Sequence, residues 1–310
     1  MKINQARFEQ IPTDEPVFLF KSCVANEIYP GIESCFHKIL DIIGTKWVES
    51  DDQTCCGGVF ENFAPTLTTI ATGALNFSIV EELGLKNILT PCNECLSVLL
   101  DAKEYSNKQK NKTKIDKILK EVGKKLKNEV EIFHIGEFIY KNLNRIIPLK
   151  KIDLSGFKIA CHYGCHYIRI HRDIILDDPV EPQILDEIAQ KLGAKTVQYE
   201  EKYLCCGMGY IQKQIHPNKS LEISYKKIKS ITEAKPDLIL TICPSCFNIF
   251  DNAQIELEIE KDFEERIPVI HLTQFVGLYL GLDPIDDLGL DMNKTPILPL
   301  LLEKLAPPQK

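Results

Sequence analysis

Hydrophobic and polar positions along the chain follow two alternating patterns: short apolar runs, and longer stretches with helical spacing. Ile32, Phe36, Ile39 and Ile43, for example, recur every three or four positions, and Gly44 follows them where a helix would end. The first half therefore predicts a strand at 17–21, a helix at 32–43, a strand at 47–48, a helix at 64–83 and a strand at 87–90.

The second half repeats this order. Gly193-Ala194-Lys195-Thr196-Val197 corresponds to Gly44-Thr45-Lys46-Trp47-Val48, and both segments lead into acidic turns. The expected elements are a strand at 158–160, a helix at 183–192, a strand after Gly193, a helix at 221–234 and a strand just before Cys243. Alternating strands and helices predict an α/β fold with parallel strands. We expect two tandem duplicated αβ domains with short parallel sheets, at residues 1–150 and 151–310.

Three segments lie outside this repeat. Residues 1–16 are expected to be an irregular lead-in, and the Pro-rich residues 296–310 a docking or disordered tail. Residues 101–128 are rich in lysine but keep a helical pattern, so they favour a solvated helical insertion. A docking surface for an acidic partner is the alternative for that insertion.

The duplication also repeats the cysteines. Cys55-Cys56-Gly57 precedes Cys92-x-x-Cys95 in the first half, and Cys205-Cys206-Gly207 precedes Cys243-x-x-Cys246 in the second. Thirty-five residues separate Cys56 from Cys92, and thirty-six separate Cys206 from Cys243. Because the cysteines follow predicted parallel strands, they should gather at the carboxyl edge of each sheet.

Composition narrows the chemistry of these cysteines. The formal charge of −7 argues against a nucleic-acid binder, which would be basic. No apolar run is long enough to span a bilayer, and residues 1–16 lack the apolar core of a signal peptide. We therefore expect a cytoplasmic protein, where twelve cysteines would bind metal or do redox chemistry rather than form disulfides.

The number of cysteines in each half favours an iron–sulfur site over zinc. Zinc and cubane iron–sulfur clusters each take four protein ligands. The first half offers five thiols: Cys23, Cys55, Cys56, Cys92 and Cys95. Five soft ligands predict a larger or irregular iron–sulfur assembly, and a structural zinc protein is a remote alternative. In the second half Cys161 and Cys165 both end a strand, so position alone does not choose between them; Cys35 is expected to be a small buried hydrophobe.

The complete pattern resembles the cysteine-rich domain found in the B-type subunits of heterodisulfide reductases. The pattern begins with a single cysteine, and thirty-one to thirty-nine residues later comes Cys-Cys-Gly. After another thirty-five or thirty-six residues it ends with Cys-x-x-Cys. The turn at 29–33 and the run Cys161-His162-Tyr163-Gly164-Cys165-His166 are also similar to those subunits. The resemblance covers residues 17–280 and favours Cys165 over Cys161 as a ligand. It implies the second ligand set Cys165, Cys205, Cys206, Cys243 and Cys246.

The resemblance implies a catalytic role. Each motif would hold a noncubane [4Fe-4S] cluster, and the substrate would be the disulfide of coenzyme M and coenzyme B, reduced to two thiols in one-electron steps. The implied partners are an iron–sulfur subunit of the C type and a flavin subunit of the A type. A paralogue with the same clusters and another thiol, disulfide or sulfur substrate is the main alternative. Both products are acidic, so His162, His166 and Arg169 are candidate substrate cations; a hydrogen bond to cluster sulfur is the alternative for the histidines.

Overall fold

The carboxyl-terminal edges of two similar parallel sheets position the cysteines. The computed structural model describes residues 3–61, 63–209, 212–261 and 263–305. Within them, strands β1 to β4 form one four-stranded sheet in the order β2-β1-β3-β4, and β5 to β8 form another in the order β6-β5-β7-β8. All strand pairs in both sheets are parallel. The predicted α/β fold with a duplicated domain is therefore confirmed.

The first half contains fourteen described elements, in the order expected around its strands. They are α1 (Gln5–Gln10), β1 (Val17–Leu19), α2 (Cys23–Glu27), α3 (Pro30–Ile42), β2 (Trp47–Val48), η1 (Gly58–Phe60), α4 (Thr66–Glu82), β3 (Asn87–Thr90), α5 (Asn93–Asn107), α6 (Gln109–Glu121), β4 (Glu131–His134), α7 (Ile135–Lys141), α8 (Leu143–Ile146) and η2 (Ile147–Leu149).

The second half repeats the strand and helix order without an equivalent of α6 among its described residues. Its described elements are β5 (Lys158–His162), α9 (Cys165–Arg169), α10 (Ile184–Lys191), β6 (Lys195–Val197), α11 (Gln212–Ile215), α12 (Pro217–Glu233), β7 (Leu238–Thr241), α13 (Pro244–Lys261), β8 (Val269–His271), α14 (Leu272–Tyr279), η3 (Leu290–Met292) and α15 (Leu298–Leu305). The register confirms the duplication, because Val17 pairs with Trp47 as Ile159 pairs with Thr196.

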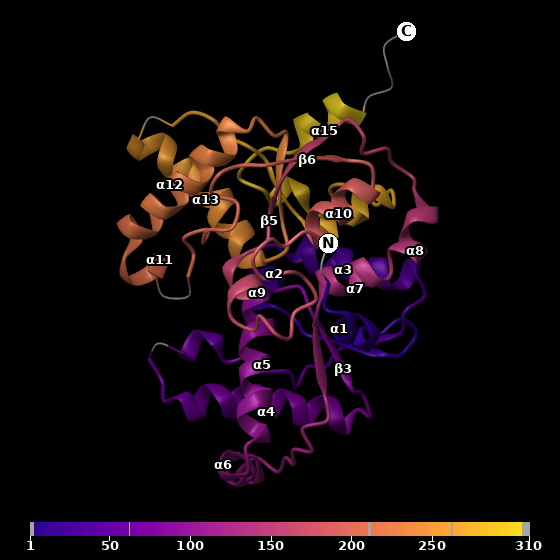
Figure 1. Cartoon of the computed structure of the whole chain (residues 1–310), viewed down its shortest axis with the longest axis vertical. Helices are drawn as coiled ribbons and strands as arrows, with labels where there is room; N and C mark the ends of the chain where they lie inside the picture. The colour runs from indigo at the N-terminus through magenta and orange to yellow at the C-terminus, as the bar shows by residue number, and fades with distance from the viewer. Residues whose placement is uncertain (1–2, 62, 210–211, 262, 306–310) are drawn as a thin grey trace.

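The helix that follows the last strand of each sheet packs against the other half. Helix α14 packs on α3, and α7 packs on α10. These two helices, α7 and α14, are called the exchanged helices below. Each begins at a buried histidine, His134 or His271, whose side chain accepts a hydrogen bond from a backbone N–H in a capping box. Figure 1 shows α3, α7 and α10 together in the middle of the molecule, with α4–α6 at one end and α12 and α13 toward the other. The domain division at residue 150 stays a prediction.

The segments outside the repeat are more ordered than the sequence suggested. Residues 1–16 include α1, whose Arg7 forms a buried ion pair with Glu137 at 2.7 Å. The expected docking or disordered tail is in part a helix, α15, with Leu301 buried; residues 306–310 lie outside the described part of the chain. Local sequence patterns do not predict these two helices, because the residues that stabilise them are distant in sequence.

The lysine-rich insertion forms the end of α5 and then α6. Ile115 and Leu119 on α6 are buried, which confirms the helical pattern. Lys103 and Lys124 pair with Glu131 and Glu82. The alternative role of the lysine-rich insertion, as a docking surface for an acidic partner, stays a prediction. Within the described ranges, no helix combines the length and the apolar character needed to cross a membrane.

Candidate metal centres

The cysteines stand where parallel strands end and helices begin. Cys23 opens α2 after β1, and Cys92 is the N-cap of α5 directly after β3. Cys165 opens α9 after β5 in the second half. This placement follows from the parallel topology, which brings all strand carboxyl ends to one edge.

The first cysteine array consists of Cys23, Cys55, Cys56, Cys92 and Cys95. The thiol of Cys56 lies beside those of Cys55 and Cys95, and the thiol of Cys95 also lies beside that of Cys92. Cys23 lines a cavity of about 310 Å³ together with Cys55, Cys56 and Cys95. Contacts with Cys55 and Cys95 lower the pKa of Cys56.

The second cysteine array consists of Cys165, Cys205, Cys206, Cys243 and Cys246, which line one cavity. The sulfur atoms of Cys165 and Cys205 lie 3.9 Å apart. Contacts with Cys165 and Cys206 lower the pKa of Cys205, whereas in the first array the lowered pKa belongs to Cys56, the second cysteine of the pair. Both arrays repeat three sulfur contacts: between the two adjacent cysteines, between the second of them and the last cysteine, and within the Cys-x-x-Cys motif.

Backbone amides support both arrays in the same way. Gly57 N–H points to Cys55 Sγ at 3.4 Å, and Gly207 N–H points to Cys205 Sγ at 3.3 Å. Both glycines have φ near +100°, and a Cβ on either would come within 2.7 Å of Thr69 O or 2.6 Å of Ser224 Oγ. Five convergent thiols with amide donors at sulfur fit an iron–sulfur cluster in each array.

The spare cysteines lie apart from the arrays. Cys161 is fully buried on β5, where its carbonyl accepts a hydrogen bond from Tyr199 at 2.9 Å. Cys35 is fully buried on α3 and donates its S–H to Thr273 O at 2.9 Å. These positions agree with Cys165 as the ligand, but the ligand sets themselves stay predictions.

The two arrays meet where the Cys-x-x-Cys motifs of the two halves touch. The thiols of Cys92 and Cys243 lie beside each other, close enough for each to shift the pKa of the other. Beside them, Asn93 donates to Tyr163 O at 2.7 Å, and Ser245 donates to Glu94 at 3.1 Å. Asn93 and Glu94 also line the cavity of the second array.

Glu94 is the residue that sequence reasoning missed at this junction. Burial, with the nearby thiolates of Cys243 and Cys56, raises its pKa to about 9. The only signal in the sequence is its position between Cys92 and Cys95, where the second motif has Ser245. Only the tertiary structure shows that the carboxyl of Glu94 lies near thiols of both arrays.

The three candidate substrate cations lie in different surroundings. His162 is 1% exposed, and its ligand nitrogen lies within 4.8 Å of Cys206 and Cys246. Burial lowers the pKa of His162 well below its ordinary value. His166 lines the second array's cavity, with Nδ1 3.6 Å from Cys165 Sγ. Arg169 is exposed and donates to Tyr203 O at 2.9 Å. The role of each of the three side chains stays a prediction.

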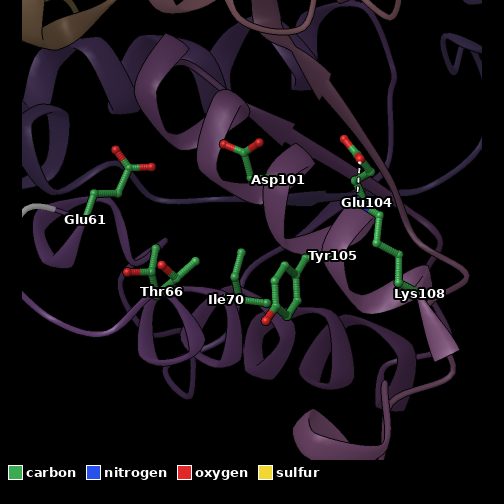
Figure 2. A pocket seen from close by; sticks show the side chains of 8 residues that line it. Glu61, Thr66, Ile70, Asp101, Glu104, Tyr105 and Lys108 are labelled. Atoms are coloured by element: carbon green, nitrogen blue, oxygen red, sulfur yellow. Dashed lines mark hydrogen bonds and ion pairs between the residues drawn. The ribbon is translucent and has the colours of Figure 1, made fainter. Parts of the chain in front are cut away.

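A further cavity, of about 420 Å³, lies between α4 and α5 and contains no cysteine among its lining residues. Figure 2 shows the carboxylates of Glu61, Asp101 and Glu104 around it, with Glu104 paired to Lys108. Without a cysteine in its lining, this cavity offers no thiolate to an iron–sulfur cluster.

Comparisons with known proteins agree with this geometry. A family described as a cysteine-rich domain matches residues 17–100 and 159–251. The chain is 31% identical to the B-type subunit of the ferredoxin:CoB-CoM heterodisulfide reductase of Methanosarcina acetivorans, over 93% of this chain and 96% of that protein. It is 28% identical to the 8-methylmenaquinol:fumarate reductase membrane anchor subunit of Wolinella succinogenes, over 88% of this chain and 95% of that protein.

A solved structure shares the fold. The crystal structure of a hypothetical protein from Helicobacter pylori matches with a TM-score of 0.72 and 16% identity, and the match covers 95% of this chain and 58% of that chain. The two matched domains and the similarity over nearly the full length identify the family. The chain belongs to the cysteine-rich domain family that includes the B-type subunits of heterodisulfide reductases.

Proposed function

We propose that this chain is the catalytic subunit of a heterodisulfide reductase, and that it reduces the disulfide of coenzyme M and coenzyme B to two thiols. The contact between Cys92 and Cys243 carries the proposal, because it brings two five-thiol arrays together at one junction. Reducing one disulfide needs two electrons and two protons. Two adjacent one-electron centres match that demand.

The cofactors of the proposal are two noncubane [4Fe-4S] clusters, one in each cysteine array. When bound, each cluster would supply one electron to the disulfide. The chain's own contribution is the ligand set, the Gly57 and Gly207 amides that stabilise thiolate charge, and His166 at the cavity wall. Electrons would come from an iron–sulfur subunit of the C type, supplied in turn by a flavin subunit of the A type.

The test is turnover of the coenzyme M–coenzyme B disulfide by anaerobically purified protein with a reduced viologen dye. We expect two dye molecules to be oxidised for each disulfide and two thiols to appear. Iron and sulfide are measured in the same sample. Zinc without sulfide would overturn the cofactor assignment, and iron and sulfide without turnover would overturn the substrate.

A paralogue acting on another thiol, disulfide or sulfur substrate is the second candidate. The lining of the second array's cavity favours it: among the described residues there, Glu94 is acidic and no lysine or arginine is present. A substrate with a sulfonate and a phosphate would gain from cations at those positions. Turnover of an uncharged disulfide, with none of the coenzyme M–coenzyme B disulfide, would select this candidate.

A further inference from the structure

Three potential metal-ligating side chains meet in the first half, and none of them belongs to either cysteine array. Glu33 and His37 lie one turn apart on α3, and Glu49 follows β2. One ligand atom from each residue lies within 4.8 Å of the other two. The spacing of Glu33 and His37 places both on one helix face, so the helix itself sets two of the three positions.

Glu33 is the observation that points to a ligand. Its side chain is 7% exposed, and its Oε2 has no hydrogen-bond partner among the described residues. Burial, followed by the charge of Glu49, raises the pKa of Glu33 to about 7. Burying a carboxyl without a partner costs free energy, and a bound cation would remove that cost.

The other two side chains are fixed in place but remain accessible. His37 Nε2 lies 2.6 Å from Glu49 Oε1, and the imidazole stacks on Trp47 with an interplanar angle of 4°. His37 and Glu49 are 26% and 19% exposed, so an ion can reach them from solvent. Lys21 pairs with the other oxygen of Glu49 at 3.4 Å, which leaves Oε1 facing His37.

The second half has a cation of its own at the equivalent place. Aligning Gly44 with Gly193 pairs His37 with Asp186 and Glu49 with Gln198. There the ammonium of Lys202, 3% exposed, lies 2.8 Å from both Asp186 oxygens and 3.3 Å from Gln198. In the first half, residues 50–54 include no lysine or arginine, and the cation that is present, Lys21, pairs with Glu49 Oε2 rather than with the Oε1 that faces His37.

We propose that Glu33, His37 and Glu49 bind one divalent transition-metal ion. Two carboxylates and an imidazole form a ligand set suited to Mn²⁺, Fe²⁺ or Zn²⁺. The ion replaces the proton between His37 and Glu49 and pairs with Glu33. It joins α3 to the loop that leads to Cys55, a loop already held by the two hydrogen bonds between Gln53 and the Lys21 backbone at 2.9 Å.

The experiment is a titration of the full chain, purified with its clusters, with Mn²⁺ under anaerobic conditions. Mn²⁺ is the probe because it prefers oxygen and nitrogen to thiolates, so it reports on this site rather than on the cysteines. The electron paramagnetic resonance signal of free Mn²⁺ measures binding. We expect one Mn²⁺ per chain, and a rise in Tm when it binds.

Glu33→Gln and His37→Gln should each weaken Mn²⁺ binding by at least about tenfold and abolish the Tm rise, since even outer-shell changes cause losses of that size. Glu27→Gln is the matched control: Glu27 is an exposed carboxylate close to the site, and its variant should bind as the wild type does. Absence of Mn²⁺ binding to the wild type would overturn the proposal. Equal binding by the wild type and both site variants would also overturn it.

Discussion

Cys205 and Cys35 show how the same side chain takes two different roles. Cys205 Sγ accepts from Gly207 N–H and lies 3.9 Å from Cys165 Sγ, in a cavity lined by five thiols. Cys35 is enclosed between α3 and α14, where it donates to a carbonyl and burial raises its pKa. The neighbours of each thiol set its role: Cys205 stands among convergent thiols, as a cluster requires, whereas the Cys35 thiol donates to a carbonyl.

We predict that Cys205→Ala removes about half of the iron and sulfide, because one of the two proposed clusters would lose a ligand. Cys35→Ala should keep the full iron and sulfide content and lose about 1 kcal/mol of stability with its hydrogen bond. Metal and sulfide analysis of both variants, with urea unfolding of the second, checks this. Unchanged iron in the Cys205 variant would remove Cys205 from the ligand set.

Helix α15 shows that a segment predicted as a tail is held by the second half. Ile297 and Leu301 are buried, and Lys304 pairs with Asp237 at 2.9 Å. Thr295, just before the helix, donates to Asp251 at 2.7 Å. Figure 1 shows α15 at the upper edge of the molecule, over the second half. The helix therefore covers apolar surface.

We predict that ending the chain after residue 296 lowers stability by about 2 kcal/mol or more, the value of burying one large aliphatic side chain. The matched control ends after residue 305, which keeps every described contact of α15. Urea unfolding of the two truncated chains measures the difference. Equal unfolding midpoints would show that α15 contributes nothing to the folded state.

On the scale of the whole molecule, the halves are joined by His171 as well as by the exchanged helices. His171, in the second half, has its Nε2 3.0 Å from Ser97 O and 3.3 Å from Asp101, both on α5 of the first half. Burial alone would lower the pKa of His171, but the hydrogen bond and charge of Asp101 outweigh burial and raise it.

The sign of the pH dependence follows from this raised pKa. The stability that protonated His171 contributes is fully present below its unfolded pKa of about 6.5, and is lost as pH rises through the folded value. His171→Gln should therefore destabilise the protein more at pH 6 than at pH 9 in urea unfolding. His216→Gln, at an exposed histidine, should show no such difference. A pH-independent effect of His171→Gln would contradict the charged contact.

The sequence by itself determined the repeated strand and helix order, because that order depends on local periodicity and on glycines such as Gly44 and Gly193. It also determined which cysteines follow strands, and hence that they gather at sheet edges. The ends of elements shifted by a few residues, as with α12, which begins at Pro217 rather than at 221.

Only the tertiary structure decided which distant residues meet. Arg7 forms an ion pair with Glu137, Ser245 donates a hydrogen bond to Glu94, and α14 packs on α3. Each of these contacts joins residues more than a hundred positions apart. No local pattern encodes such pairs, because they depend on how the two halves pack together. The same packing brings Cys92 against Cys243, so the two copies of the cysteine motif meet at one junction.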